Sequence, residues 1–277
     1  MRLTALLVLV CALLASCAPA RLPQEDSQVA VSRVLDAMRV FRNETESQRQ
    51  SVIIFIHGAS DRSWHQEYER WVNRMTAEGY AVVALDLYAG RSVSGSAARS
   101  GGFVPQEAVG DLMITLDWLQ SQAWADQDNI FAIGSSFGGA VIMDALVFSN
   151  PARSVPAISS APQSAMNNLT AGILMAPLCM EDVFGVRIVE AVYSPFFTHK
   201  PVLAIIPGAD TVSDVEACRV IFNREAANGS AIEVIEYAGA GHTFMAQTDD
   251  YGDPSPDYNQ TDAEDAWSKI FQYLSGF

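Results

Sequence analysis

Short apolar runs alternate with longer stretches of mixed polarity along this chain. Six of these runs predict strands, at residues 51–58, 81–86, 129–134, 171–177, 201–208 and 231–239. The continuous apolar run at 51–58 suits a strand buried on both faces of a sheet. Apolar positions at helical spacing predict helices at residues 66–80, 107–122, 137–148, 213–228 and 262–277. Alternating strands and helices form βαβ units. The pattern therefore predicts an α/β fold with a mainly parallel sheet and helices on both faces.

Two segments interrupt this pattern. Residues 28–43 fit a helix and a strand equally well, so both assignments stay open. Residues 89–106 are rich in Gly, Ser and Ala, which predicts a mobile loop. Neither an internal repeat nor a second domain boundary is visible. We expect one domain over residues 51–277, preceded by a linker and the first strand or strands at residues 18–50.

The first 17 residues have the features of an export signal. Arg2 supplies a positive charge, and residues 3–15 form an apolar stretch that is short for a membrane span. The sequence LASC at residues 14–17 is similar to a bacterial lipobox, in which the cysteine is lipidated and becomes the new N-terminus. Ordinary cleavage after APA, residues 18–20, is the alternative. We expect an exported protein that is either periplasmic or a lipoprotein held at a membrane through Cys17.

Composition and charge narrow the classes of partner. The formal net charge is −15, and 49% of the residues are hydrophobic. A chain this acidic repels phosphate backbones, so a nucleic-acid partner is not expected. No cluster of Lys and Arg suits an anionic membrane surface. We therefore expect membrane contact only through the N-terminal lipid.

Cys11 and Cys17 belong to the signal region, so the body of the mature protein keeps Cys179 and Cys218. In an oxidising compartment two such residues tend to form a disulfide, and two separate buried thiols are the alternative. The chain has no CxxC motif, and its four histidines are scattered. This spacing gives no indication of a metal site.

The segment GSSFG, residues 134–138, joins the predicted strand at 129–134 to the helix at 137–148. It fits the motif G-x-S-x-G in one frame only, with Ser136 at the centre. A serine at a sharp turn from strand to helix has its Oγ exposed above the sheet, and small neighbours allow strand and helix to approach closely. Ser136 is therefore the candidate nucleophile.

A nucleophilic serine needs a base, and the base needs a carboxylate that orients it. Asp210 and His242 each follow a predicted strand, at the carboxyl edge where open α/β sheets bind ligands. The order Ser136, Asp210, His242 is the one that α/β-hydrolases use. Asp214 is a second acid candidate, but its position predicts an N-cap for the next helix.

The oxyanion of the reaction needs backbone N–H donors. The N–H of Phe137, directly after the serine, and that of Ala59, after the first long strand, are the candidates. His57 is expected to shape the loop that carries Ala59. His65 and His199 are expected on the surface or in a pocket wall. Trp64 and Phe244 fit a pocket wall and the core equally well.

Several segments together resemble the dienelactone hydrolase family of α/β-hydrolases: FIHGASD, ALDLYAGR, IFAIGSSFGGAVIMDA, IIPGAD, GAGHTF and DYNQTDAEDAW. The resemblance implies an α/β-hydrolase fold and hydrolysis of an ester or lactone without a cofactor. The founding activity of the family uses a cysteine nucleophile, where this chain has Ser136, which argues against dienelactone itself as the substrate. Some exported members have cysteines in positions that match Cys179 and Cys218, which favours the disulfide.

The predicted function is therefore that of an exported carboxylic ester hydrolase with a small-molecule ester or lactone substrate. Residues 51–277 would form its catalytic domain. One alternative is a hydrolase of small peptides or acyl-peptides. A second is a non-catalytic surface lipoprotein that keeps a relic hydrolase fold, and a third is an acyltransferase, because an acceptor alcohol and water compete for the same acyl-enzyme.

Overall fold

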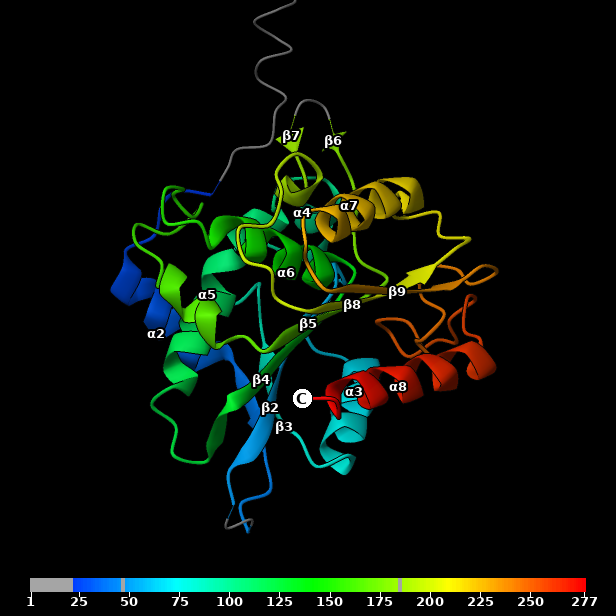
Figure 1. Ribbon diagram of the computed structural model, residues 1–277, viewed down its shortest axis with the longest axis horizontal. Coiled ribbons are helices and arrows are strands. Elements are labelled where there is room, and N and C mark those ends of the chain that lie inside the picture. Colours follow the sequence, from blue (N-terminus) through cyan, green and yellow to red (C-terminus); the bar gives the residue numbers. More distant parts are fainter. Residues whose placement is uncertain (1–21, 46–47, 184–185) are drawn as a thin grey trace, which may run out of the picture.

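A computed structural model of the protein describes residues 22–45, 48–183 and 186–277. The predicted export signal and Cys17 lie outside these residues. All six strands predicted from the apolar runs are present in the main sheet, and the order of strands and helices is that of an α/β fold (Figure 1).

The main sheet has seven strands among the described residues, in the order β1-β3-β2-β4-β5-β8-β9. Strand β1 pairs antiparallel with β3, and every other neighbouring pair is parallel. A separate antiparallel pair, β6 and β7, was not predicted. The strands are β1 (Arg39–Phe41), β2 (Gln50–Ile56), β3 (Ala81–Leu85), β4 (Ala125–Ser135), β5 (Ala171–Met175), β6 (Asp182–Val183), β7 (Val186–Arg187), β8 (Val202–Pro207) and β9 (Ile232–Tyr237).

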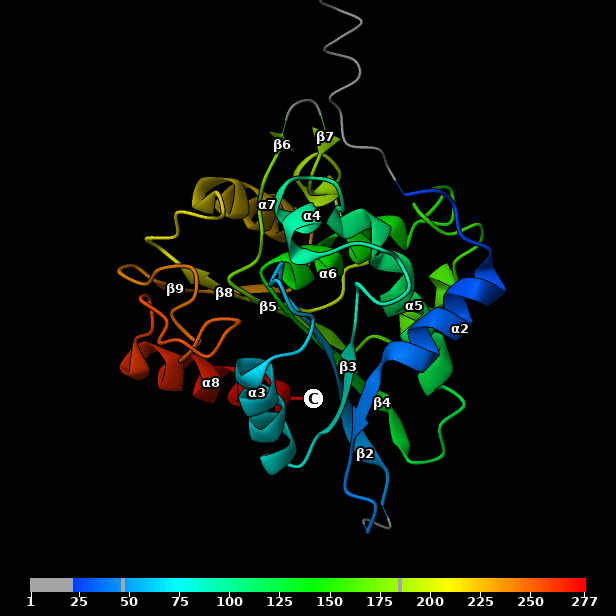
Figure 2. The same cartoon turned by 180° about the vertical axis from the view of Figure 1, so that it is seen from behind.

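Helices cover both faces of the sheet, as the sequence predicts (Figures 1 and 2). One apolar layer packs α3 and α8 against the sheet, and the other packs α2, α5, α6 and α7. The α-helices are α2 (Ser27–Ala37), α3 (Gln66–Ala77), α4 (Gly95–Arg99), α5 (Val109–Leu119), α6 (Phe137–Phe148), α7 (Val215–Ala227) and α8 (Gln260–Leu274). The described residues also include the short 3₁₀ turns η1 (Pro105–Glu107), η2 (Gln163–Asn168) and η3 (Glu190–Val192).

The ambiguous segment 28–43 forms a helix followed by a strand. Asp26 caps α2 by accepting hydrogen bonds from the N–H groups of Gln28 and Val29, which fixes the start of the helix. The chain becomes extended at Met38 and continues into β1. Both assignments were therefore correct for part of the segment.

The segment 89–106 contains secondary structure where the sequence predicted only a loop. Ser94 caps α4 by accepting a hydrogen bond from Ala97 N–H. Arg91 is buried and pairs with Asp111 of α5, which also pairs with Arg33 of α2. These ion pairs tie the segment to two helices. Gly and Ser content alone gives no information about such contacts.

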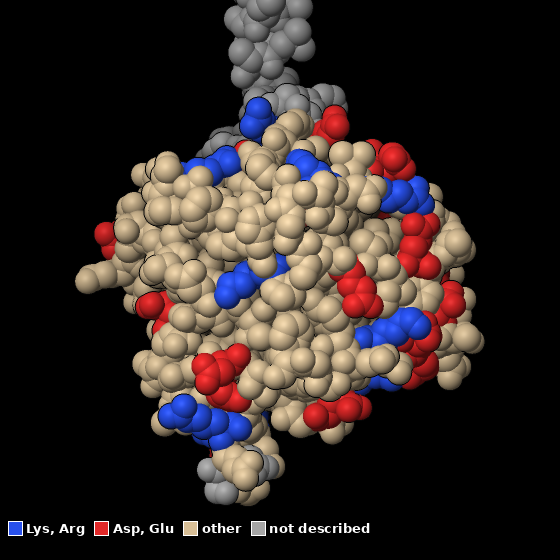
Figure 3. All heavy atoms as spheres, viewed as in Figure 1, with Lys and Arg blue, Asp and Glu red and all other residues tan. Residues whose placement is uncertain are grey.

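Charged side chains are scattered over the surface. On the face seen in Figure 3, Lys and Arg side chains stand apart from one another and form no continuous basic patch. Within the described part of the chain, no helix combines the length and the apolarity that a membrane crossing requires.

Candidate active site

Ser136 lies at the turn between β4 and α6, where the motif predicts it. Its backbone has φ 51° and ψ −112°, a conformation that is rare for any residue other than glycine. The turn is held from the neighbouring strand, because Ser136 N–H donates to Met175 O at 2.9 Å. The strained turn presents the Ser136 side chain at the carboxyl edge of the sheet.

The glycines around Ser136 allow strand and helix to touch. A Cβ atom on Gly134 would lie 2.3 Å from Gly138 O, and one on Gly138 would lie 2.2 Å from Ile56 O. Both contacts are with backbone atoms that cannot move aside. The spacing G-x-S-x-G is therefore a packing requirement of this turn.

Asp210 and His242 form a hydrogen-bonded chain with Ser136. His242 Nδ1 lies 2.6 Å from Asp210 Oδ2, and His242 Nε2 lies 2.9 Å from Ser136 Oγ. The side chains of His242 and Asp210 are 11% and 1% exposed. With an ionised Asp210, Nδ1–H donates to the carboxylate, and Nε2 is left to accept the Ser136 proton. The structure brings together all three residues that the sequence singled out.

The carboxylate of Asp210 is stabilised as an anion. Burial raises the pKa of this carboxyl, but the hydrogen bond and charge of His242, with the N–H groups of Ser213 and Val212, hold the pKa below its ordinary value. Asp214, the competing candidate, accepts a hydrogen bond from Ala217 N–H at the start of α7. It is an N-cap, as its position predicts.

The two predicted oxyanion donors lie in segments next to Ser136. Phe137 is the first residue of α6, so its N–H has no acceptor within the helix. Ala59 follows Gly58, and a Cβ atom on Gly58 would lie 3.4 Å from the Cβ of Ser136. Within the described chain, the N–H of Ala59 has no hydrogen-bond acceptor either. Both amides are therefore available to a bound group.

Three aromatic or imidazole side chains hold the loop that carries Ala59. His57 donates from Nδ1 to Gly58 O at 2.7 Å and accepts from Leu87 N–H at 3.0 Å. Its burial lowers its pKa, so it is neutral. Tyr68 accepts from Gly58 N–H at 3.0 Å, and Tyr88 donates to Ser60 O at 3.0 Å. The structural role expected of His57 is present.

Sequence reasoning missed the two tyrosines. Tyr68 is an apolar position of α3 in the sequence pattern, and nothing in that pattern indicates where its hydroxyl points. Arg99 was missed as well, and it donates to Ala59 O at 2.7 Å. The only available signal was that buried tyrosine hydroxyls usually find a partner.

A cavity of about 320 Å³ opens beside Ser136 and His242. Its wall is mainly apolar and includes Tyr68, Met175 and Phe244. Phe244 is thus both buried and part of the wall. Trp64 does not line this cavity and stacks instead on Phe41 of β1.

The other histidines lie away from the hydrogen-bonded chain. His65 is in the cavity wall, 3.6 Å from Asp250, and its ring packs at a tilt against that of Tyr68. His199 contacts the hydroxyl of Ser230 at 3.0 Å. In the described residues, no cluster of His, Cys, Asp and Glu has an arrangement that could hold a metal ion.

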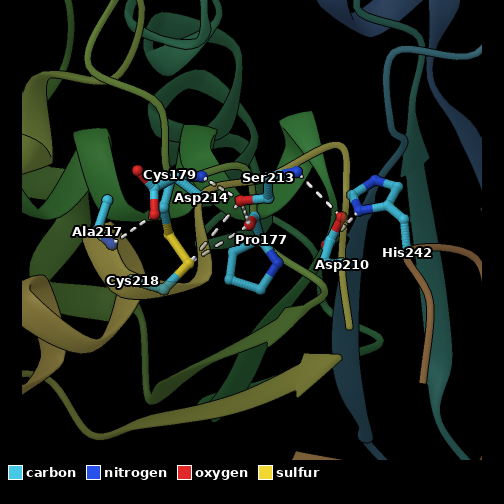
Figure 4. The surroundings of a disulfide bond; sticks show 8 residues. All are labelled: Pro177, Cys179, Asp210, Ser213, Asp214, Ala217, Cys218 and His242. Atoms are coloured by element: carbon cyan, nitrogen blue, oxygen red, sulfur yellow. Dashed lines mark hydrogen bonds and ion pairs between the residues drawn. A yellow bond between two sulfur atoms is a disulfide. The ribbon is translucent and has the colours of Figure 1, made fainter. Parts of the chain in front are cut away.

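Cys179 and Cys218 form a disulfide, with Cα atoms 5.2 Å apart. The pairing favoured by the family resemblance is confirmed. The bond joins the segment after β5 to the first turns of α7, close to Asp210 (Figure 4).

Two family models match consecutive parts of the chain. The model of serine aminopeptidase S33 matches residues 47–187, and that of the dienelactone hydrolase family matches residues 184–277. The junction of the two matches lies after Ser136 and before Asp210 and His242. The chain is therefore an α/β-hydrolase. Its last third, residues 184–277, matches the dienelactone hydrolase family, in agreement with the resemblance of its motifs.

Solved structures share the fold at low sequence identity. A candidate dienelactone hydrolase from Klebsiella pneumoniae subsp. pneumoniae has a TM-score of 0.66 and 16% identity, over 87% of this chain and 92% of that one. Esterase 2 of Thermogutta terrifontis phosphonylated by cyclosarin has a TM-score of 0.62 and 17% identity, over 85% and 88%. The propionate-bound form of the Thermogutta enzyme has a TM-score of 0.60 and 15% identity, over 86% and 88%.

Proposed function

We propose that the protein hydrolyses a carboxylic ester or lactone through an acyl-enzyme on Ser136. The observation that carries this proposal is the hydrogen-bonded chain from Asp210 through His242 to Ser136, at the mouth of a cavity. An isolated serine at a tight turn would not be a nucleophile, because it needs a base within hydrogen-bond reach. Here the base is at 2.9 Å and is itself oriented by a carboxylate at 2.6 Å.

The reaction would use each group in turn. Ser136 Oγ attacks the carbonyl carbon as its proton moves to His242 Nε2, and Asp210 stabilises the imidazolium that forms. The N–H groups of Ala59 and Phe137 bind the oxyanion. His242 then gives its proton to the leaving alkoxide, and the acyl group stays on Ser136. Water attacks the acyl-enzyme, with His242 again as the base, and the free acid leaves.

The cavity favours a small substrate. Its volume of about 320 Å³ is at the lower end of the range of small-molecule sites. The Thermogutta esterase of the same fold has been obtained with propionate bound. Short acyl groups are the first substrates to test, and the turnover of longer ones reports the depth of the cavity.

A small-peptide hydrolase is a second candidate function, favoured by the match to the serine aminopeptidase model over residues 47–187. The same nucleophile, base and oxyanion donors would cleave an amide. The two candidates differ in the leaving group, an alcohol for the ester and an amine for the peptide. Matched p-nitrophenyl esters and aminoacyl p-nitroanilides distinguish them directly.

We also propose that the protein works outside the cytoplasm. The disulfide between Cys179 and Cys218 is consistent with an oxidising compartment. The lipobox-like sequence at residues 14–17 predicts attachment through Cys17. Mass spectrometry of the mature N-terminus tests this. A diacylglyceryl-modified Cys17 differs in mass from the free N-terminus that cleavage after APA, residues 18–20, would leave.

The test of the proposed function is hydrolysis of a p-nitrophenyl ester series, from acetate to decanoate, by the wild type and by Ser136→Ala. The wild type is expected to turn over the short esters. The variant is expected to lose ~10⁴-fold or more of kcat, as when other triad serines are removed. Equal turnover by the two proteins, or wild-type activity on the anilides alone, would contradict an ester hydrolase that uses Ser136.

A further inference from the structure

The end of β5 and the short segment after it, residues 175–179, contact the nucleophile directly. Ser136 N–H donates to Met175 O at 2.9 Å, and Leu178 N–H donates to Ser136 O at 3.0 Å. Ser136 is thus held through both of its backbone polar groups by a segment about 40 residues further along the chain. Any group fixed to this segment is also fixed relative to the Ser136 backbone.

The loop of Asp210 is fixed to the same segment by the side chain of Ser213. Ser213 Oγ donates to Pro177 O at 2.8 Å and accepts from Cys179 N–H at 2.8 Å. A third link is the bond from Asp214 N–H to Cys179 O at 3.2 Å. Figure 4 shows Ser213 between Pro177 on one side and Asp210 on the other.

Ser213 also sets the direction of the Asp210 carboxylate. Asp210 Oδ1 accepts from the N–H groups of Val212 at 2.7 Å and Ser213 at 3.0 Å. With Oδ1 held in this way, Oδ2 faces His242 at 2.6 Å. The orientation of the imidazole therefore depends on where the backbone of Ser213 lies.

The disulfide makes the connection covalent at the same place. Cys179 belongs to the segment after β5, and Cys218 lies in the first turns of α7, where its N–H donates to Asp214 O at 3.1 Å. Both cysteines are buried, 0% and 2% exposed. The bond thus joins the segment that holds Ser136 to the helix that directly follows the Asp210 loop.

We propose that Ser213 and the Cys179–Cys218 disulfide are positioning residues for the hydrolytic reaction. They hold the loop of Asp210 at a fixed place relative to Ser136, so that His242 spans the two. This inference rests on the proposed function, because it assigns a role within the same chain of residues. It adds three residues to the site that do not touch the substrate.

A purely structural disulfide would have a different effect from a positioning one. If the Asp210 loop moves away, Oδ2 no longer holds the imidazole, and the imidazolium loses part of its stabilisation. The chemical step slows, while the cavity wall outside this loop, which includes Tyr68 and Phe244, stays in place, so kcat falls and KM changes little.

The experiment compares four variants: Ser213→Ala, Ser213→Thr, the double variant Cys179→Ser/Cys218→Ser, and Ile221→Val. Ser213→Thr keeps the hydroxyl and is the conservative rescue. Ile221 is fully buried in α7, one turn beyond Cys218, and does not contact the Asp210 loop through any hydrogen bond. Ile221→Val therefore lowers stability without touching the links. Kinetics on p-nitrophenyl acetate from about pH 5 to 9 give kcat, KM and the acid limb, which is the fall of kcat/KM toward low pH, for each folded protein. The Tm of each protein is measured separately by thermal unfolding.

Ser213→Ala and the double cysteine variant are expected to lower kcat about tenfold, with KM within about twofold, and to move the acid limb of kcat/KM to lower pH. Ser213→Thr is expected to restore most of kcat and the wild-type limb. Ile221→Val is expected to lower only Tm. If Ser213→Ala does not fold, the same measurements on the double cysteine variant and on Ser213→Thr test the positioning role.

The inference would be overturned if the Ser213→Ala and the double cysteine variants both had a lower Tm but the kcat and the acid limb of the wild type. The links would then stabilise the fold without positioning Asp210. An inactive wild type that is not labelled by a phosphonate would instead overturn the proposed function. The two failures are thus separate results of one set of measurements.

Discussion

Individual side chains fix the backbone of the loop that carries the N–H of Ala59 near Ser136. Gly58 N–H donates to the hydroxyl of Tyr68, and Gly58 O accepts from the imidazole of His57. The N–H of the next residue, Ala59, has no acceptor in the described chain. An oxyanion site needs donors that are fixed before the charge develops. The tyrosine and the histidine supply this rigidity.

Tyr68→Phe tests this role. The change leaves the ring in place and removes the acceptor of Gly58 N–H, so the loop loses one of its fixed hydrogen bonds. We expect kcat on p-nitrophenyl acetate to fall about tenfold, or ~1.4 kcal/mol in the transition state, with little change in KM. Tyr80→Phe is the matched control, because Tyr80 packs on Phe131 and Phe271, away from the site. An unchanged kcat in Tyr68→Phe would show that the loop does not need this bond.

The elements that position the site are joined by charges as well as by apolar packing. Asp111 of α5 is 3% exposed and lies between Arg33 of α2 and Arg91 of the segment before α4. Burial raises the pKa of Asp111, but the charges and hydrogen bonds of Arg91 and Arg33 outweigh it and hold the pKa below its ordinary value. Two helices and the segment 89–106 thus meet at one carboxylate.

Removal of this carboxylate should be strongly destabilising. Asp111→Ala leaves two nearly buried guanidinium groups without their shared partner, for which we expect a loss of about 3–5 kcal/mol in the free energy of unfolding. Urea unfolding measures it. Glu236→Ala removes a carboxylate from an exposed pair with Arg219 and should leave the urea midpoint close to that of the wild type. Equal midpoints for the two variants would contradict a structural role for the buried cluster.

The molecule as a whole carries an excess of negative charge, and one buried carboxyl affects its response to pH. Asp144 lies in α6, fully buried, and accepts from Ala191 N–H at 2.8 Å. Burial raises its pKa to about 8, against the opposing hydrogen bonds of Ala191 and Glu190 and the charge of Arg153. Near neutral pH the folded protein therefore keeps this group as the acid, while the unfolded chain ionises it.

Asp144→Asn should remove part of the pH dependence of stability. Between about pH 4 and pH 8 the folded wild type binds one proton more than the unfolded chain, so its stability falls as the pH rises. Asparagine keeps an oxygen for Ala191 N–H and does not titrate. We expect the stability of the variant relative to the wild type to increase from pH 5 to pH 8, by up to ~1.4 kcal/mol per pH unit. A difference that stays constant across this range would show that Asp144 titrates normally.

Much of the architecture could be predicted because it depends on local patterns. Continuous apolar runs identified the six strands, and the position of Ser136, Asp210 and His242 after three of them predicted their common edge. Contacts between distant parts of the chain could not be predicted in this way. Arg33 and Asp111 are 78 residues apart, and Tyr68 is an apolar helix position whose hydroxyl partner depends on packing. Periodicity tells which face is buried and gives no information about the polar groups that meet there.

The central claim, that Ser136 is an activated nucleophile, is tested most directly by covalent labelling. The wild type is treated with a fluorophosphonate at neutral pH, and intact mass and peptide mapping locate the adduct. We expect one phosphonyl group per molecule on the peptide that contains Ser136, and none on Ser136→Ala or after prior inactivation by another phosphonate. Adduct formation should slow in acid, because a protonated base accepts no proton from the serine. An unlabelled wild type, or a label that persists in Ser136→Ala, would contradict the account.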